Sequence, residues 1–156
     1  MTEEVAVLVP IYRDALGEYE EVSLRNIVTV LKDYPIFFVK PASLELAEVG
    51  KMFPQVKQEC FDDCFFTNIH AYNTLMLSTA FYERFSRFEY ILIAQLDTYI
   101  FRDELHQWCA KGYDYVGAPW IVRDIYRNPL MRLCSKIKKC YCDITGKPNS
   151  QITGNK

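Results

Sequence analysis

Short apolar runs alternate with longer amphipathic stretches in the first half of the chain. The runs at 5–9, 36–39 and 55–61 have the length of buried strands, and a proline lies close behind the first two. Between them, residues 20–34 and 42–53 place apolar side chains at roughly helical spacing, with charged residues interspersed. This order of strand, helix, strand, helix and strand is typical of a parallel sheet that is covered by helices.

The second half of the chain continues this pattern. Residues 68–85 are predicted to form one long helix, because apolar side chains recur along one stripe of it. The stretch 90–101 begins as a strand, and residues 104–111 follow as a short helix that ends at Gly112. Residues 113–116 are predicted to form a further strand. We therefore expect an α/β fold of the Rossmann-like kind, with a mostly parallel sheet flanked by helices.

The stretch 90–101, YILIAQLDTYIF, combines a strand with candidate chemistry. Its apolar start suits a strand that is buried on both faces, and Gln95, Asp97 and Thr98 follow it closely. A carboxylate at the end of a buried strand is costly unless it is paired, hydrogen-bonded or bound to a metal. Ligands of open α/β sheets also bind at the carboxyl ends of strands. Asp97 is therefore the first candidate binding residue, and the alternative, in which it caps the next turn, stays open.

A second candidate segment follows the first predicted strand and consists of Pro10, Ile11, Tyr12 and Arg13. It too lies at the carboxyl end of a strand, where ligands of α/β sheets bind. The Arg13 guanidinium suits a phosphate group, and the Tyr12 ring suits stacking on a base. Taken alone, the segment is better explained by a surface arginine in an ordinary turn, and the binding role stays the alternative.

A third candidate segment is the bend formed by Gly117, Ala118, Pro119 and Trp120. Small residues followed by proline and tryptophan predict a tight turn that presents an aromatic platform. Such platforms stack on sugars, but tryptophan is also a common core residue. Both interpretations stay open on the sequence alone.

The length and charge of the chain change this picture in one respect. Its 156 residues suffice for one domain with a substantial core. The net charge of −2 hides an uneven distribution, because residues 1–120 carry a net charge of −8 and residues 121–156 carry +6. We therefore divide the chain into an α/β core, 1–120, and a basic C-terminal segment, 121–156. A solvated helix face at 130–140 explains the basic charge, and a surface for anionic lipid or a phosphate-bearing acceptor is the sharper alternative.

No apolar run reaches the roughly 20 residues that a membrane-spanning helix needs. The N-terminal sequence also lacks the basic start and apolar core of a signal peptide. These features favour a cytoplasmic protein, with peripheral contact between residues 121–156 and the inner face of the membrane as an additional expectation.

The six cysteines are expected to be free thiols, because no secretion signal accompanies them. Most are explained as small buried hydrophobic residues. Cys134, Cys140 and Cys142 together offer three ligands for zinc, but their spacing fits no standard zinc motif and no histidine is near.

The residues also carry a resemblance to a known family. The run from Tyr90 to Trp120, YILIAQLDTYIFRDELHQWCAKGYDYVGAPW, resembles a bacterial family of glycosyltransferase-like proteins that is described mainly as a domain of unknown function. The pieces VPIYR at 9–13 and AYNTLML at 71–77 resemble the same family in matching order and spacing. The resemblance covers almost the whole chain, and the 31-residue run is its specific part.

This resemblance implies a fold similar to that of GT-A glycosyltransferases, in which a Rossmann-like half binds a nucleotide-activated sugar. Residues 10–13 would then lie along the nucleotide, and Asn73 would face the same cleft. Asp97, with Gln95 and Thr98 beside it, would match the first carboxylate of the Asp-x-Asp motif that contacts the sugar nucleotide and its metal. Residues 117–120 would line the sugar or acceptor side.

Two departures from the family pattern affect these expectations. The second carboxylate of the Asp-x-Asp motif is replaced by Tyr99, so the expected divalent cation, Mn²⁺ or Mg²⁺, has only one carboxylate here. Proteins resembling this chain also continue beyond a Gly-Asn-Gly-Gly segment, whereas this chain ends at Gly154-Asn155-Lys156. We therefore expect much of the acceptor-binding half to be missing, through truncation or because the chain is a fragment.

The expected reaction transfers a sugar from a nucleoside-diphosphate sugar to a carbohydrate or lipid-linked acceptor, for example in a cell-surface glycan. The leaving diphosphate must be neutralised, the anomeric carbon must be held near the acceptor, and inversion needs a base. Asp97 and Arg13 suit the first task and Trp120 the second. Asp114 is the one candidate for the base, with a solvent-exposed aspartate at a strand edge as its alternative.

Two other classes of function remain open. The missing second carboxylate and the early end favour a non-catalytic module that binds a nucleotide or sugar, and the basic segment favours an interaction protein. Nucleic acid is not an expected partner. An incomplete sheet of this kind exposes a strand edge or an apolar face, so a homodimer that covers it is a further expectation.

Overall fold

The computed structural model of the chain describes residues 3–117 and residue 137. The chain divides into two compact units, Met1–Tyr113 and Asp114–Lys156. All strands and helices named below belong to the first unit, and the domain boundary expected between residues 120 and 121 stays a prediction. Within the described residues, no helix combines the length and the apolar character needed to cross a membrane.

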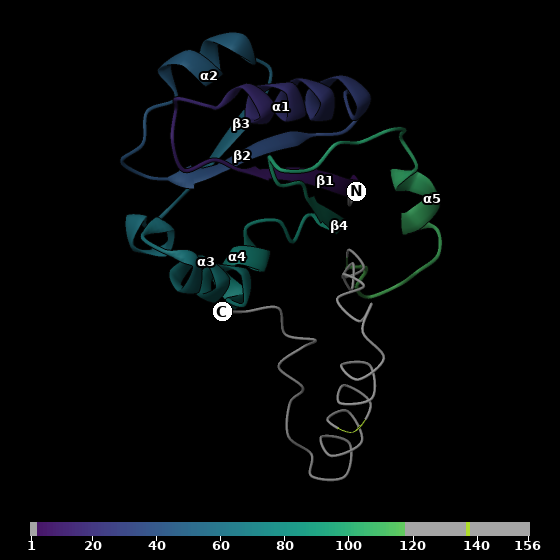
Figure 1. Ribbon diagram of the computed structural model, residues 1–156. Coiled ribbons are helices and arrows are strands. Elements are labelled where there is room, and N and C mark those ends of the chain that lie inside the picture. The colour runs from purple at the N-terminus through teal and green to yellow at the C-terminus, as the bar shows by residue number, and fades with distance from the viewer. Residues whose placement is uncertain (1–2, 118–136, 138–156) are drawn as a thin grey trace. The chain divides into compact units, whose positions relative to one another are not determined.

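The first unit is built on a four-stranded parallel sheet with the strand order β3-β2-β1-β4 (Figure 1). The strands are β1 Glu3–Pro10, β2 Ile36–Pro41, β3 Lys57–Phe61 and β4 Phe88–Ile93. The chain first proceeds from β1 outward to β3 and then returns to place β4 on the other side of β1. The structure thus confirms the predicted α/β class with a parallel sheet.

Helices cover both faces of the sheet, with α1 and α2 on one face and α3 and α4 on the other (Figure 1). Because each connection between parallel strands must return the chain to the same edge, the helices occupy the crossovers. The bounds are α1 Glu18–Val30, α2 Ala47–Met52, the 3₁₀ helix η1 Asp63–Phe66, α3 Ile69–Met76, α4 Thr79–Glu83 and α5 Leu105–Cys109.

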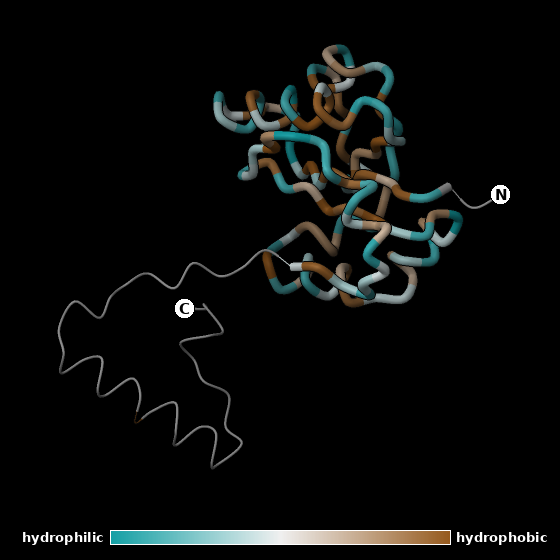
Figure 2. Tube along the Cα trace, turned by 90° about the vertical axis from the view of Figure 1, so that its right-hand side faces the viewer, coloured by the Kyte–Doolittle hydropathy of each residue, from teal (hydrophilic) through white to brown (hydrophobic). Residues whose placement is uncertain are grey.

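Strand β1 forms the centre of two hydrophobic cores. Its residues 5–9 are each at most 3% exposed, and successive side chains point to opposite faces of the sheet. Val7 packs into the core beneath α1 and α2, whereas Leu8 packs into the core beneath α3 and α4. The hydrophobic stretches accordingly concentrate in the interior of this unit (Figure 2). An unbroken apolar run is what a strand covered on both faces requires.

Strand β4 lies at one edge of the sheet formed by the described strands. Ile91 and Ile93 pack against one core and Tyr90 and Leu92 against the other, so both faces of the strand are covered as predicted. These four side chains are nevertheless only half-buried, because β4 has a strand neighbour on one side alone.

The single helix predicted over 68–85 is wrong, because the structure contains two helices, α3 and α4, in this stretch. Leu77 ends α3, and Ser78 adopts an extended backbone with φ −87° and ψ 140°. The Ser78 hydroxyl donates to the Leu75 carbonyl and accepts from the Phe81 amide, so it caps α4. The apolar stripe continues across the break, which is why hydrophobic spacing did not reveal it.

The strand predicted over 113–116 is also wrong, because these residues form no regular structure. Their alternating aromatic side chains are exposed rather than packed on a sheet, with Tyr115 86% exposed. The preceding helix is confirmed as α5, with narrower bounds than predicted. Gly112 lies three residues after the last helical residue, Cys109, and its positive φ of 65° suits glycine in the turn that follows a helix.

Candidate functional site

The strand order reverses between β1 and β4, and this reversal brings two predicted segments together. Leu8 pairs with Ile93 in the ladder, and the Ala94 amide donates to the Leu8 carbonyl at 2.9 Å. The segments 10–13 and 95–98 therefore leave the sheet side by side at its carboxyl edge. Doubly wound sheets bind ligands in the crevice at such a switch point.

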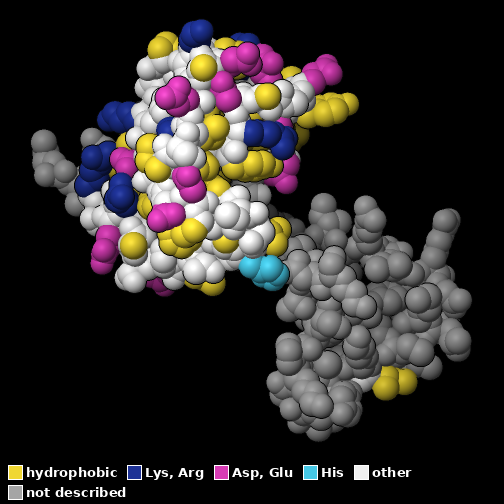
Figure 3. All heavy atoms as spheres, turned by 90° about the vertical axis from the view of Figure 1, so that its left-hand side faces the viewer, with side chains coloured by type: hydrophobic (Ala, Val, Ile, Leu, Met, Phe, Trp, Pro, Cys, Tyr) yellow, Lys and Arg dark blue, Asp and Glu magenta, His cyan; other side chains and the backbone are white. Residues whose placement is uncertain are grey.

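Figure 3 shows the side of the molecule where the loops after the strands lie. Acidic, basic and hydrophobic side chains are interspersed on this side, and no sign of charge dominates the visible described surface. Selectivity for a ligand at this edge would therefore depend on individual side chains rather than on a general electrostatic field.

Arg13 is held by an ion pair with Glu20 in the first turn of α1. Its guanidinium donates to both carboxylate oxygens of Glu20 at 2.7 Å, and Glu20 also accepts from the Gly17 amide at 2.8 Å. The hydrogen bond with Glu20 raises the pKa of Arg13, and the hydrogen bond from Arg13 lowers the pKa of Glu20. Arg13 is therefore already partnered, so a phosphate would have to compete with Glu20 for it.

The loop after β1 is also fixed by Asp14, which is not among the predicted site residues. Its carboxylate accepts from the backbone amides of Glu48 at 2.9 Å and Val49 at 3.0 Å. These amides belong to the first turn of α2, where backbone donors lack partners inside the helix. Asp14 thus caps α2 from a distant loop, and no local sequence signal reveals a cap that comes from 34 residues away.

The segment after β4 is attached to α1 by three hydrogen bonds. Ser23 donates to the Thr98 carbonyl at 2.6 Å, and the Asn26 side chain both donates to and accepts from the backbone of Ile100. The Thr98 hydroxyl donates to the Gln95 carbonyl at 2.7 Å, which closes the turn that contains Asp97. Asp97 is exposed at the tip of this turn, so its carboxylate is available to a ligand.

The expected divalent cation would find few protein ligands here. Within residues 3–117, no three His, Cys, Asp or Glu side chains are grouped so that they could hold a metal ion. Tyr99 occupies the second motif position, and its ring packs edge-on against Phe101 with centroids 5.3 Å apart. Because Mg²⁺ and Mn²⁺ require several oxygen ligands, the described residues do not fit a cation held by the protein alone. Dependence on Mn²⁺ or Mg²⁺ stays a prediction.

Two neighbouring residues of helix α3, Tyr72 and Asn73, differ in their exposure to solvent. Asn73, a predicted site residue, is exposed. The preceding residue, Tyr72, is half-buried with its hydroxyl beside the Gln95 side chain. Burial raises the pKa of Tyr72, and the nearby Gln95 opposes this shift. The helical spacing places Tyr72 on the apolar stripe of the predicted helix, and this pattern predicts no role for its hydroxyl.

The remaining predicted residues belong to the second unit. Asp114 and Gly117 are exposed, and the ring of Tyr115 lies so close to Gly117 that any side chain at 117 would displace it. Residues 118–120 lie outside the described residues. The same holds for the three candidate zinc ligands, for the predicted helix at 130–140 apart from Ile137, and for most of the basic segment 121–156.

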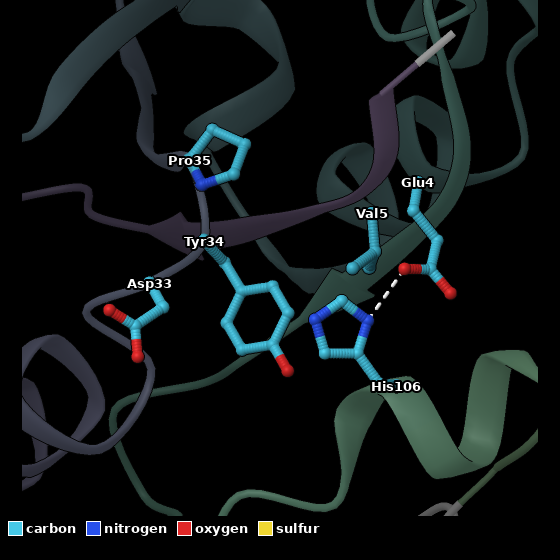
Figure 4. A pocket seen from close by; sticks show the side chains of 6 residues that line it. All are labelled: Glu4, Val5, Asp33, Tyr34, Pro35 and His106. Carbon is cyan, nitrogen blue, oxygen red and sulfur yellow. Dashed lines mark ion pairs between the residues drawn. The ribbon is translucent and has the colours of Figure 1, made fainter.

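A separate pocket of about 220 Å³ lies at the opposite, amino edge of the sheet (Figure 4). His106 pairs with Glu4 across it at 2.6 Å, and the ring of Tyr34 lies 4.9 Å from that of His106. Both members of the ion pair are substantially exposed, so the pair contributes little to stability. Because this pocket is far from the switch point, its polar side chains serve to attach α5 and are not part of the candidate site.

The fold and the switch point define an α/β domain with a parallel, Rossmann-like sheet that is covered by helices on both faces. Residues 55–148 match the family described as "Protein of unknown function (DUF5672)". This match spans more than half of the chain, and the chain therefore belongs to that family. Among curated proteins, no match to the chain is found.

Proposed function

We propose that this chain is the donor-binding part of a GT-A-like glycosyltransferase, which transfers a sugar from a nucleoside-diphosphate sugar to an acceptor hydroxyl. One observation carries the proposal: two polar segments leave a parallel sheet together at the reversal of its strand order. Nucleotides bind at this point in doubly wound sheets because the loops diverge there and leave room for them. The resemblance of the run 90–120 to glycosyltransferase-like proteins supports a sugar nucleotide over other nucleotides.

The segment after β1 is suited to the nucleotide itself. The Tyr12 side chain is 57% exposed, and the Arg13 guanidinium lies 5.2 Å from the centre of its ring. A base that stacks on Tyr12 would gain contact area without a rearrangement of the backbone. Arg13 contributes to phosphate binding when a phosphate replaces Glu20 as its partner, since both offer two oxygens to the guanidinium.

The segment after β4 is suited to the sugar. An exposed carboxylate such as that of Asp97 accepts hydrogen bonds from sugar hydroxyl groups. The attachment of Thr98 and Ile100 to α1 fixes the turn that carries Asp97 and so reduces the entropy lost on binding. The diphosphate charge still has to be neutralised by cationic groups, and the described carboxylates do not perform that task.

Isothermal titration calorimetry of the full chain against UDP, GDP and their sugars, with and without manganese, tests this proposal. We expect saturable binding of one nucleotide class. Asp97→Ala is expected to weaken binding of the sugar nucleotide by about tenfold or more, which corresponds to about 1.4 kcal/mol. The matched control is Asp33→Ala, because Asp33 is an exposed aspartate at the opposite edge of the sheet. Equal binding by wild type and Asp97→Ala, with an unchanged circular dichroism spectrum, would count against the proposal.

A non-catalytic module that binds a sugar nucleotide is the second candidate. The observation that favours it is the single carboxylate at the switch point, with Tyr99 in place of the second. Binding of the donor without sugar transfer to any acceptor and without donor hydrolysis would select this candidate. Release of the nucleoside diphosphate during incubation with the donor would instead select the enzyme.

A further inference from the structure

The hydroxyl of Tyr72 is a buried polar group without a partner. Among the described side chains, it is the one buried oxygen or nitrogen that makes no hydrogen bond. Tyrosine hydroxyl groups that are buried away from water normally form a hydrogen bond, because a buried polar group without one destabilises the fold. Such an exception among the described side chains calls for a physical explanation, and a role in ligand binding is one.

The position of this hydroxyl connects it to the candidate site. Tyr72 lies on α3, and its hydroxyl lies beside the Gln95 side chain, which follows β4 at the carboxyl edge. Gln95 is exposed and lies two residues before Asp97 in the same turn. Its side chain is therefore exposed at this edge and also lies beside the buried hydroxyl.

The orientation of the Gln95 carboxamide determines how this side chain would contact an anionic ligand. One end of the carboxamide accepts hydrogen bonds and the other donates them, so its orientation decides whether it attracts or repels a phosphate oxygen. Burial disfavours the charged form of Tyr72 and raises its pKa, so the hydroxyl keeps its proton at neutral pH. Gln95 opposes this shift and lowers the pKa of Tyr72, as a donor that faces the phenol oxygen does. The carboxamide must therefore turn its oxygen toward the neutral phenol, and its amino end is then free to face a ligand.

We propose that Tyr72 is a positioning residue: when a nucleoside diphosphate occupies the carboxyl edge, the Tyr72 hydroxyl donates to the Gln95 side-chain oxygen, and the Gln95 amino group donates to an oxygen of the diphosphate. This inference rests on the proposed function and names the atoms that recognise its anionic part. It also explains the orphan hydroxyl, because the hydrogen bond is completed only with the ligand in place. Tyr72 does not touch the ligand and acts through Gln95.

The test compares Tyr72→Phe with Tyr82→Phe in the full chain, using UDP and GDP as probes. Tyr82 is the matched control, because its hydroxyl donates to the Met76 carbonyl at 2.8 Å and is therefore satisfied without a ligand. Tyr72→Phe is expected to weaken nucleotide binding by about tenfold while its melting temperature stays unchanged or rises. Tyr82→Phe is expected to bind as wild type does and to melt at a lower temperature.

A double-mutant cycle with Gln95→Leu tests the route through Gln95. Because Gln95 is exposed, its replacement should leave the fold intact. We expect Gln95→Leu to weaken binding about as much as Tyr72→Phe does, and the double variant to bind no more weakly than either single variant. Fully additive losses would overturn the relay through Gln95.

Two further outcomes distinguish this inference from the proposed function. If wild type binds the nucleotide and Tyr72→Phe binds equally well, the positioning role is overturned and the proposed function stands. If folded wild type binds neither UDP nor GDP, both are overturned together.

Discussion

Asn26 and Ile100 exchange two hydrogen bonds across the boundary between α1 and the segment that follows β4. The Asn26 side chain donates to the Ile100 carbonyl at 3.0 Å and accepts from the Ile100 amide at 2.7 Å. The carboxamide thus satisfies both backbone groups of one residue, as a neighbouring strand would. This pair attaches the segment after β4 to α1 at a point three residues after Asp97, so helix α1 supports the candidate site.

Asn26→Ala is expected to destabilise the chain by about 1–3 kcal/mol, because it leaves two partly buried backbone groups without partners. Ser23→Ala removes only one hydrogen bond to the same segment and should cost less. Urea unfolding measures both losses, and hydrogen exchange should show faster exchange of the Ile100 amide in Asn26→Ala. Unchanged stability and unchanged protection of that amide would show that the segment is held by other contacts.

Asp14 should make the stability of the chain sensitive to acid. Its hydrogen bonds, the largest contribution coming from the Glu48 amide, lower its pKa below the ordinary value of 3.8. A lowered pKa in the folded state means that the stabilisation is complete above about pH 3.8 and is lost as the pH falls through the folded value.

Asp14→Ala is accordingly expected to lose about 1 kcal/mol at neutral pH, as the removal of other helix caps does. The difference from wild type should shrink when unfolding is measured at progressively lower pH, below 3.8. Asp33→Ala is the matched control, since it removes an exposed aspartate at the opposite edge of the sheet. A difference that stays constant down to strongly acidic pH would contradict this account.

Tyr34 should make the stability sensitive to alkali. Burial, together with its hydrogen bond to Asp103, raises the pKa of Tyr34 from 10 to about 12. A raised pKa means that this stabilisation is fully present below pH 10 and is lost as the pH rises toward 12. Tyr34→Phe should cost about 1–3 kcal/mol at neutral pH, because a hydrogen bond to a carboxylate is lost.

The alkaline unfolding of wild type and Tyr34→Phe measures this effect. The stability advantage of wild type should disappear between pH 10 and pH 12. An ultraviolet titration of the tyrosine side chains should also show that the group ionising at the highest pH is absent from Tyr34→Phe. If the free energies of unfolding of wild type and Tyr34→Phe differ by a constant amount throughout this pH range, ionisation of Tyr34 is not linked to stability.

Two glycines should respond to alanine in opposite directions. Gly112 has a positive φ of 65°, and no atom lies within 4 Å of the position that an added methyl group would take, so Gly112→Ala costs backbone strain alone, about 1 kcal/mol. Gly50 lies inside α2, and an added methyl group would meet only ordinary contacts, the nearest at 3.8 Å. Gly50→Ala is therefore expected to stabilise the chain by up to about 1 kcal/mol. Thermal melts of the two variants measure both effects, and shifts in the same direction would refute this interpretation.

The sequence predicted the strand and helix order of the first unit well, because unbroken apolar runs and helical spacing are local signals. It failed where a single polar side chain overrides such a signal. Ser78 divides the helix predicted over 68–85 by capping a new one, although the apolar spacing continues through it. Tyr113 and Tyr115 flank the polar Asp114 as in a strand, but no neighbouring strand pairs with them in the described structure.

The position of the two candidate segments at the carboxyl edge of the sheet was predicted, but the hydrogen bonds within them were not. Parallel strands bring their carboxyl ends to one edge, so the grouping of segments 10–13 and 95–98 follows from topology. The pairing of Arg13 with Glu20 and the cap that Asp14 provides depend on how loops fold back. The orphan hydroxyl of Tyr72 is visible only once the packing around it is known.

The most direct test of the central claim is the location of nucleotide binding. We would titrate the isotope-labelled chain with UDP and with GDP and follow the backbone amide signals by nuclear magnetic resonance. The account predicts that one nucleotide shifts signals at 11–13 and 94–98 most strongly, with little change around Tyr34 and His106 at the amino edge. Shifts centred on the amino-edge pocket, or no shifts in a folded sample, would contradict it.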